Sequence, residues 1–475
     1  METKWYEDAL VYHIYALSLA EAPFINDYSA SNHKCGEIEK WIPHIKGMGF
    51  NTVLFGPVLK SRSHGYDVTD YFEIDNRLGT NAEFQALVRK LHENGIRVML
   101  DCVFNHCGRD FFAFQELRNN NRDFADWFSG VDFGKQSPLG DPFTYSTWAG
   151  YYELPKYNLK NSGIKDYLLK AARFWIEYFE IDGMRLDSAD VLDFDFMAEL
   201  RRTTENVKPD FWLMGEVVHG NYSKWVNATA LHSVTNYALY KSLFSSHNNN
   251  NLFELASSLK NSAPNNGLPL YIFLDNHDQN RIASVVSNAA YLNTLYTLLY
   301  TVPGIPSVYY GSEWGIQGVK KNGSDQEIRP YINIENRSAY NTWLTEHISK
   351  LAQIRQREKA LKYGSYEQVY LEYNCPFVFG RSCENERILV AVNIADAKKS
   401  INLSKCGSGG FFDLLSDERV LDSGNVEMKP YSARILKAAT YFVFLAVPIF
   451  LISPPFSIVA KTASIVVGLT SGNRL

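Results

Sequence analysis

Four apolar segments of this chain each give way, at the C-terminal end, to polar residues that carry chemistry. They are residues 97–106, 183–187, 211–216 and 270–278, and their polar residues are Asp, Glu, His and Asn. Apolar runs of this length are typical of strands that are buried on both faces of a parallel sheet. In a parallel barrel, the residues that follow the strands form the active site. The pattern therefore predicts an α/β fold with a polar site at one edge of its sheet.

Arg185 and Asp187 lie two residues apart in the second of these segments. On a strand they would share a face, so the guanidinium would lie beside the carboxylate. A neighbouring positive charge lowers the pKa of an aspartate, and an ionised carboxylate is what a nucleophile requires. An ordinary ion pair at a strand end is the alternative for this segment taken alone.

Strand-like and helix-like patterns alternate along most of the chain, and the strand patterns number eight. Strands are expected near residues 11–15, 52–55, 97–104, 183–186, 211–215, 233–237, 270–274 and 307–310. Helices are expected near residues 37–48, 81–94, 164–180, 193–207, 252–261 and 342–357.

The alternation stops between residues 107 and 160, which is too long a stretch for a barrel loop without structure of its own. We expect a small inserted domain there. Residues 111–152 contain twelve aromatic residues. Some must form the core of the insert, whereas Trp148, Tyr151 or Tyr152 could instead stack on a substrate.

The composition argues against several classes of function. Forty-seven basic and 52 acidic residues give a net charge of −5 without a long basic block, so nucleic acid is not an expected partner. The six cysteines lack a CxxC spacing, and Cys102 falls within a predicted strand. We therefore expect free, buried thiols. The N-terminus carries no apolar leader, which predicts a cytoplasmic protein.

The segments DCVFNH (101–106), GMRLD (183–187), MGE (214–216) and FLDNHD (273–278) resemble, in this order, the four characteristic segments of the alpha-amylase family, glycoside hydrolase family 13. A fifth, LPKYN (154–158), resembles a segment of the neopullulanase and cyclomaltodextrinase branch. The resemblance extends from residue 5 to about residue 437. It implies a (β/α)8 TIM barrel (1–106 and 161–360), a domain inserted after strand 3 (107–160) and a C-terminal β-sandwich (361–437).

The resemblance also implies the roles of individual residues in a retaining mechanism, which uses two carboxyl groups. Asp187 would be the nucleophile, Glu216 the general acid and base, and Asp278 a third carboxylate that holds sugar hydroxyls. His106 and His277 would donate hydrogen bonds to the same sugar, and Arg185 would fix Asp187.

Three further residues are candidates for substrate binding. Within SHGYD (63–67), Tyr66 resembles the family tyrosine that stacks on the sugar, and His64 lies beside it. A tyrosine that only fills its own loop is the alternative. Arg281, three residues after Asp278, would either bind a substrate hydroxyl or balance the acidic pocket.

Many family members hold a calcium ion between barrel and insert, and Asn105 matches one ligand position. However, Asp190 and Val191 replace the family's usual Lys-His pair. One amide cannot supply the six to eight oxygens that calcium takes. We therefore expect neither a metal site nor another cofactor.

The function expected from the resemblance is hydrolysis of α-1,4-glucosidic bonds in maltodextrins, starch or cyclodextrins. A transglycosylase that uses the same site is the alternative, and a non-catalytic barrel scaffold is a third reading that three carboxylates argue against. Loop shape decides among the substrates. The branch usually carries an additional N-terminal domain that builds its dimer, whereas this sequence begins at the barrel, so the oligomeric state is left open.

Residues 438–475 lie beyond the resemblance. Residues 438–460 carry no charge and would be long enough to cross a bilayer. However, Pro448, Pro454 and Pro455 would interrupt such a helix. An appended tail without a role in catalysis is therefore expected in preference to a membrane anchor.

Overall fold

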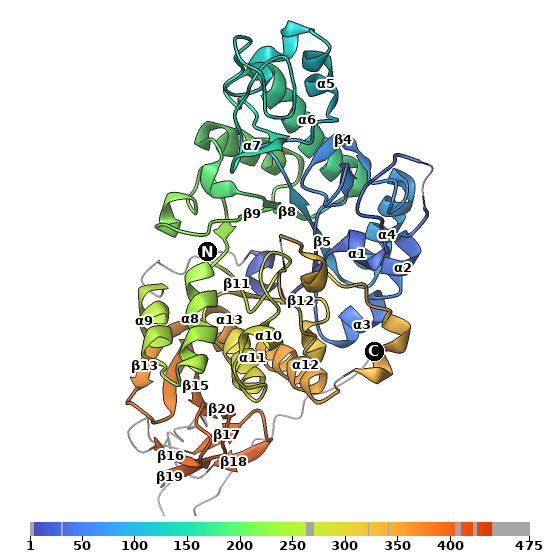
Figure 1. The fold of residues 1–475 in the computed structure, drawn as a ribbon. Helices are drawn as coiled ribbons and strands as arrows, with labels where there is room; N and C mark the ends of the chain where they lie inside the picture. Colours follow the sequence, from blue (N-terminus) through green and yellow to red (C-terminus); the bar gives the residue numbers. More distant parts are fainter. Residues whose placement is uncertain are drawn as a thin grey trace, which may run out of the picture. The chain divides into compact units, whose positions relative to one another are not determined.

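In the computed structural model, eight parallel strands form one sheet that closes on itself (Figure 1). The structure describes residues 4–29, 32–262, 270–321, 323–340, 342–403, 410–420 and 425–438. The strand order is β10-β9-β8-β5-β2-β1-β12-β11. Thr235, directly after β10, pairs in parallel with Tyr271 of β11, which closes the ring. The predicted TIM barrel is thereby confirmed.

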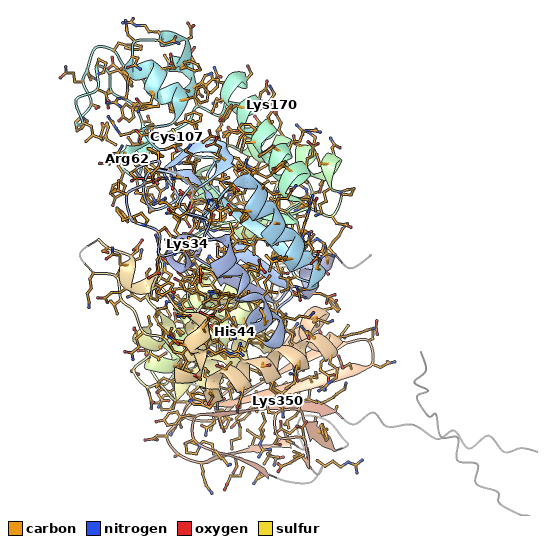
Figure 2. The ribbon with its side chains drawn as sticks, turned by 90° about the vertical axis from the view of Figure 1, so that its right-hand side faces the viewer. Lys34, His44, Arg62, Cys107, Lys170 and Lys350 are labelled. Carbon is orange, nitrogen blue, oxygen red and sulfur yellow. The ribbon has the colours of Figure 1, made fainter. Side chains whose placement is uncertain are left out.

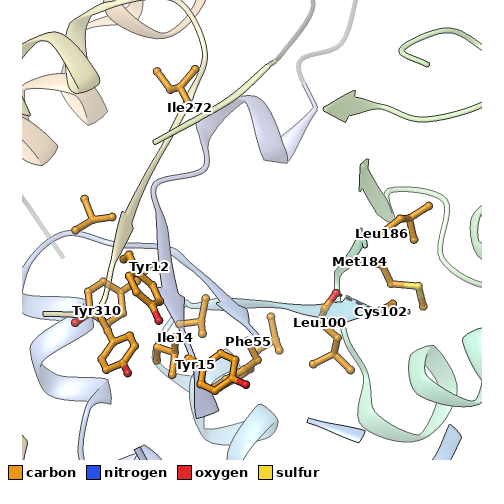
Figure 3. Close-up of a cluster of buried hydrophobic side chains, with 14 of the residues drawn as sticks. Tyr12, Ile14, Tyr15, Phe55, Leu100, Cys102, Met184, Leu186, Ile272 and Tyr310 are labelled. Carbon is orange, nitrogen blue, oxygen red and sulfur yellow. Dashed lines mark hydrogen bonds between the residues drawn. The ribbon is translucent and has the colours of Figure 1, made fainter. Parts of the chain in front are cut away.

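The barrel strands lie where the sequence predicts them: β1 (Val11–Ile14), β2 (Thr52–Phe55), β5 (Arg97–Cys102), β8 (Gly183–Leu186), β9 (Trp212–Gly215), β10 (Ser233–Val234), β11 (Tyr271–Phe273) and β12 (Ile305–Tyr309). Alternate residues point to opposite faces. Leu54, Met99 and Met214 belong to one buried cluster. Leu100 and Met184 belong to the second, larger cluster (Figure 3). Both faces are apolar, as a sheet with helices on its outside requires.

Thirteen α-helices lie within the described residues: α1 (Ala16–Leu19), α2 (Cys35–Glu39), α3 (Ile42–Gly47), α4 (Asn81–Glu93), α5 (Phe112–Arg118), α6 (Ser162–Phe179), α7 (Phe194–Val207), α8 (Tyr237–Asn248), α9 (Phe253–Ser262), α10 (Ile282–Val285), α11 (Tyr291–Thr301), α12 (Thr342–Arg357) and α13 (Lys359–Tyr363). The start of α4 is a capping box, in which Thr80 and Glu83 each accept a hydrogen bond from the other's main-chain N–H. The pairs α6 and α7, α8 and α9, and α11 and α12 lie side by side (Figure 1).

The helices differ from the prediction in two respects. The helix expected at residues 37–48 is two helices, because Pro43 cannot donate the bond that would continue the first one, and α3 begins beside it. Among the helices of more than ten residues, α8 and α11 were not predicted. All residues of α11 except Asn293 are buried, so it lacks the apolar stripe by which an amphipathic helix is recognised.

The segment predicted as an insert contains α5, η2 (Arg122–Trp127), β6 (Thr147–Trp148) and β7 (Tyr151–Pro155). Between β2 and α4 lies a separate hairpin of β3 (Leu59–Ser61) and β4 (Val68–Ile74). Phe114 packs edge-on against Phe128 and Phe143. The buried Asp141 pairs with both Arg109 and Arg118. The insert therefore has an aromatic core and a charged clamp of its own.

The C-terminal strands form two antiparallel sheets, which confirms the predicted β-sandwich. One has the order β13 (Ser365–Tyr370), β14 (Phe377–Cys383), β15 (Glu386–Asn393), β20 (Ser432–Ala438), β17 (Phe411–Asp413) and β18 (Glu418–Val420); the other pairs β16 (Lys399–Asn402) with β19 (Asn425–Met428). Leu389, Ile401 and Met428 pack between the sheets. Lys350 of α12 reaches Asp417 at 2.7 Å, where helix and sheet meet (Figure 2).

Five cysteines lie within the described residues and all are unpaired; Cys35, Cys102 and Cys107 are buried, and Cys375 and Cys383 are half-buried. Cys406 and the predicted tail beyond Ala438 lie outside the described residues. In the part of the chain that the structure describes, we find no helix both long and apolar enough to span a membrane.

Candidate active site

The polar residues predicted at the strand ends meet at the C-terminal edge of the barrel. The sheet's hydrogen bonds continue past the strands and fix two of them: Asp187 N donates to Cys102 O, and Glu216 N donates to Leu186 O, both at 2.9 Å. Asp101 of β5 and Arg185 of β8 are direct partners in the strand register. Three neighbouring strands thus place Asp101, Asp187 and Glu216 around Arg185.

Arg185 is the centre of a buried network of charges. Its Nη1 lies 2.7 Å from both carboxylate oxygens of Asp101 and 3.2 Å from Asp187 Oδ1. Its Nη2 lies 2.9 Å from Glu216 Oε2. The Arg185 side chain is only 4% exposed. One guanidinium therefore neutralises part of the charge of three carboxylates.

Burial, together with the adjacent Glu216 carboxylate, raises the pKa of Asp187 well above its usual range, although Arg185 acts in the opposite direction. The prediction that Arg185 would lower this pKa is wrong in its net direction, because the loss of solvent outweighs a guanidinium shared among three carboxylates.

Ser188 links the two carboxyl groups to the insert. It has a left-handed backbone (φ 48°), which is strained for a residue other than glycine. Its N–H donates to Glu216 Oε2 and its hydroxyl to Asp187 Oδ2, both at 3.1 Å. Trp148 Nε1 donates to the Ser188 hydroxyl at 2.9 Å. The strained turn therefore holds both carboxyl groups.

Asp278 has two nitrogen partners, on His277 and Arg329, that the other carboxylates lack. His277 Nε2 lies 2.8 Å from its Oδ2, and Arg329 Nη2 lies 3.0 Å from its Oδ1. Burial by itself would raise the pKa of Asp278, but His277 and Arg329 outweigh it and lower the pKa below its usual range. Asp278 is therefore ionised at every working pH.

The remaining predicted residues surround this centre at different depths. Tyr66 stacks on His277 with ring centroids 5.5 Å apart, and its hydroxyl donates to Asp101 at 2.9 Å. His106 packs 5.7 Å from the Trp148 ring, and burial lowers its pKa to about 3, so it is neutral. His64 is partly exposed.

A cavity of about 430 Å³ has His64 in its wall. Arg329, the partner of Asp278, lines it as well, together with Tyr15, Phe24 and Asp325. Its wall thus combines aromatic faces with hydrogen-bonding groups. These complement the two kinds of surface on a sugar ring, its apolar C–H faces and its hydroxyl groups.

The placement of Arg281 excludes one of the two roles considered for it, binding of a substrate hydroxyl. This side chain is completely buried, and it donates to the main-chain oxygens of Ile328 and Tyr310. Its guanidinium also lies 4.0 Å from the centre of the Tyr309 ring. Arg281 therefore holds loops together beneath the site and does not present donors to a substrate.

Several residues that contact the predicted site were not identified from the sequence, among them Asp101, Arg329 and Tyr237. Asp101 lies in the segment 97–106. Residues two apart on a strand share a face, so its position two residues after the buried Met99 was the signal that could have identified it. Arg329 and Tyr237, which donates to Glu216 at 3.1 Å, gave no such signal. They lie in a loop and at the start of a helix, whose paths an apolar pattern does not predict.

The aromatic residues of the insert fall into two groups. Trp148 and Tyr151 stack on one another at 5.9 Å beside Ser188, and Tyr151 is largely exposed. Tyr152 instead packs on Tyr145. The first two thus lie beside the predicted site, and Tyr152 belongs to the core of the insert.

The residues around Asn105 do not fit a calcium ion. The Asn105 amide is buried, and its Nδ2 contacts His106 Nδ1 at 3.2 Å. Among the residues that the structure describes, no three His, Cys, Asp or Glu side chains are grouped so that they could hold a metal. Carboxylate oxygens, which calcium prefers, are therefore not gathered at this place.

Comparison with known proteins places the chain among characterised enzymes. Residues 34–330 match the alpha amylase catalytic domain. A cyclomaltodextrinase of Thermoanaerobacter pseudethanolicus is 31% identical over 422 residues, which cover 85% of this chain and 70% of that protein. A maltogenic alpha-amylase of Bacillus acidopullulyticus is 31% identical over 427 residues, 82% of this chain and 70% of that one. The structure of the ligand-free cyclic alpha-maltosyl-(1→6)-maltose hydrolase from Arthrobacter globiformis superimposes with a TM-score of 0.80 at 25% identity, over 92% of this chain and 100% of that chain.

Proposed function

Because the chain belongs to the alpha-amylase family of glycoside hydrolases, we propose that it hydrolyses α-1,4-glucosidic bonds in maltodextrins, starch or cyclodextrins with retention of anomeric configuration. The observation that carries this proposal is the arrangement of Asp187 and Glu216 around one guanidinium, with the ionised Asp278 nearby. A retaining glycosidase needs two close carboxyl groups that share one proton.

The proposed first step is attack of a carboxylate oxygen of Asp187 on the anomeric carbon. As the bond from this carbon to the glycosidic oxygen breaks, its electron pair stays on the oxygen, which takes the proton of Glu216. In the second step Glu216 removes a proton from water, the resulting hydroxide attacks the anomeric carbon, and Asp187 leaves. Both carboxyl groups then regain their starting state.

The other residues support these steps in our proposal. Asp278 would bind two hydroxyl groups of the reacting sugar, since it is ionised and held by His277 and Arg329. Tyr66 and His106 would contact the same sugar. The cavity beside Arg329 and His64 would accept further glucose units, because Arg329, which lines it, also holds Asp278.

Product analysis tests the proposal directly. The purified protein is incubated with maltoheptaose, β-cyclodextrin, starch and pullulan, and the products are separated by chromatography. We expect glucose, maltose or maltotriose from at least one of the first three substrates. Products longer than the substrate would show that the intermediate passes to a sugar hydroxyl instead of water. A protein that hydrolyses none of the four substrates would contradict the proposal.

We further propose that catalysis requires no calcium ion, because the surroundings of Asn105 do not fit one. Incubation with EDTA should leave both the melting temperature and the rate of maltodextrin hydrolysis unchanged. A known calcium-dependent amylase serves as the positive control. A joint loss of stability and activity that added calcium restores would show this proposal to be wrong.

A further inference from the structure

A chain of two hydrogen bonds joins the loop after β11 to the carboxyl group of Glu216. Asn276 Nδ2 donates to the hydroxyl of Tyr237 at 3.2 Å, and this hydroxyl contacts Glu216 Oε1 at 3.1 Å. All three side chains are buried. Tyr237 is the first residue of α8, so a helix start and a loop converge on the same carboxyl group.

The direction of these bonds follows from the partners. Asn276 Oδ1 accepts a bond from Asp278 N at 2.8 Å, which turns the NH2 group of the amide toward Tyr237. The phenol oxygen therefore accepts from Asn276, and its single hydrogen is left to donate to Glu216. Burial and the Glu216 charge raise the pKa of Tyr237 well above its usual range. The hydroxyl thus keeps this hydrogen at every working pH.

We propose that Tyr237 is a positioning residue that holds Glu216 and stabilises the carboxylate formed when Glu216 protonates the leaving oxygen. This inference rests on the proposed function. As the proton moves to the glycosidic oxygen, negative charge develops on Glu216, and a donated hydrogen bond to a charged group is stronger than one to a neutral group. Tyr237 would therefore favour the transition state over the ground state.

Other charged groups also face Glu216, and the effect of Tyr237 must be separated from theirs. Four charged groups act on it: Asp101 of β5, Arg185 of β8, Asp187 directly after β8, and the exposed Asp190 of η3 (Ala189–Val191). None of these side chains changes when the Tyr237 hydroxyl alone is removed. The Tyr237 ring also packs on Phe273 at 5.0 Å, a contact that phenylalanine would keep.

The test compares Tyr237→Phe with Tyr240→Phe, one turn along the same helix. Tyr240 is buried to the same degree and packs on the same Phe273, but its hydroxyl is 3.5 Å from Gln279 and makes no bond to Glu216. Losing a hydrogen bond to a charged group should lower kcat/KM for maltoheptaose by about 10- to 100-fold in Tyr237→Phe. Tyr240→Phe should stay within about twofold of the wild type.

The leaving group distinguishes a role in proton transfer from a role in packing. Fluoride leaves without needing a proton, so the kcat/KM of Tyr237→Phe for α-maltosyl fluoride should remain within about threefold of the wild type. The ratio of the two kcat/KM values does not depend on the folded fraction of the sample, so partial unfolding of the variant does not obscure the result.

The pH profile provides a second readout. A hydrogen bond donated to the charged form lowers the pKa of a carboxyl group. Its removal should therefore move the alkaline limb of kcat/KM for maltoheptaose to higher pH. The inference would be overturned if the alkaline limb of Tyr237→Phe stays at the wild-type pH and its kcat/KM falls equally for maltoheptaose and α-maltosyl fluoride. It would also be overturned if the kcat/KM of Tyr237→Phe for maltoheptaose equals that of the wild type. A wild-type protein without activity on maltoheptaose or on α-maltosyl fluoride would instead count against the proposed function.

Discussion

Asp187→Asn and Glu216→Gln should each reduce kcat for maltodextrin hydrolysis by several orders of magnitude while the protein stays folded. The asparagine amide of the first variant cannot attack an anomeric carbon, and the glutamine amide of the second cannot transfer a proton. Both substitutions change almost no volume, and an amide oxygen can still accept the bonds from Arg185 and Ser188. Removing a residue that takes part in the reaction costs about 10⁴-fold or more where the groups act as a unit.

The measurement is the hydrolysis rate of preparations that are free of host amylase. Asp210→Asn and Glu205→Gln are matched controls, since both carboxylates are at least partly open to solvent and lie in surface ion pairs away from the site. Near wild-type turnover in either Asp187→Asn or Glu216→Gln would contradict the assignment of the carboxylates. A loss of activity in the controls would show that the substitutions act through expression or folding.

Arg185→Met should lower the free energy of unfolding by about 3–5 kcal/mol at pH 7, because it leaves three buried carboxylates without their shared cation. Methionine nearly preserves the length of the side chain, so the loss reflects charge more than packing. The destabilisation should shrink as the pH falls, since burial raises the pKa values of Asp101 and Asp187 and their protonation removes the repulsion that Arg185 balances. The difference in the free energy of unfolding between Arg185→Met and the wild type should therefore be smaller at acidic pH.

Chemical denaturation at pH 7 and pH 5 provides the comparison. Arg173→Met is the control: this arginine pairs with Glu177 on the exposed face of α6, and its loss should cost no more than about 0.5 kcal/mol. A change below about 1 kcal/mol for Arg185→Met, or one that grows as the pH falls, would mean that Arg185 does not carry the balance of charge in the site.

Much of the fold could be predicted because a parallel barrel has a strong signature in sequence. Its strands are buried on both faces, so most of them appear as short apolar runs, and the eight strands lie where the sequence predicts them. The helix α4 has an apolar stripe and a capping box, and both are visible in the sequence. The helix α11 is buried nearly all round, so its pattern cannot be told from that of a strand or loop.

Mainly those site residues that lie at or shortly after the end of a barrel strand could be predicted. Asp187, Glu216 and Asp278 follow strands, and the closed parallel sheet brings all such positions to one edge. Arg329 and Tyr237 reach the same place from a loop and from a helix start, which depends on tertiary structure. Arg281 was a candidate for either substrate binding or charge balance because it lies close to Asp278 in sequence, but its side chain points to main-chain oxygens beneath the site.

The direction of the pKa change at Asp187 could not be predicted either. The sequence places Arg185 beside it, and this pair alone would lower the pKa. Only the fold shows that Arg185 is shared with Asp101 and Glu216 and that all four side chains are buried. The sign of a pKa shift is therefore predicted wrongly from sequence neighbours alone when other strands bury the group and bring like charges next to it.

Trapping of the covalent intermediate tests the central claim most directly. Glu216→Gln is incubated with 5-fluoro-α-maltosyl fluoride, whose good leaving group allows the first step without an acid, while the missing base slows the second. Intact mass spectrometry should show one added glycosyl unit per chain, and peptide mapping should place it on Asp187. A label on another residue, or no label together with a product of inverted anomeric configuration from the wild-type protein, would contradict this account.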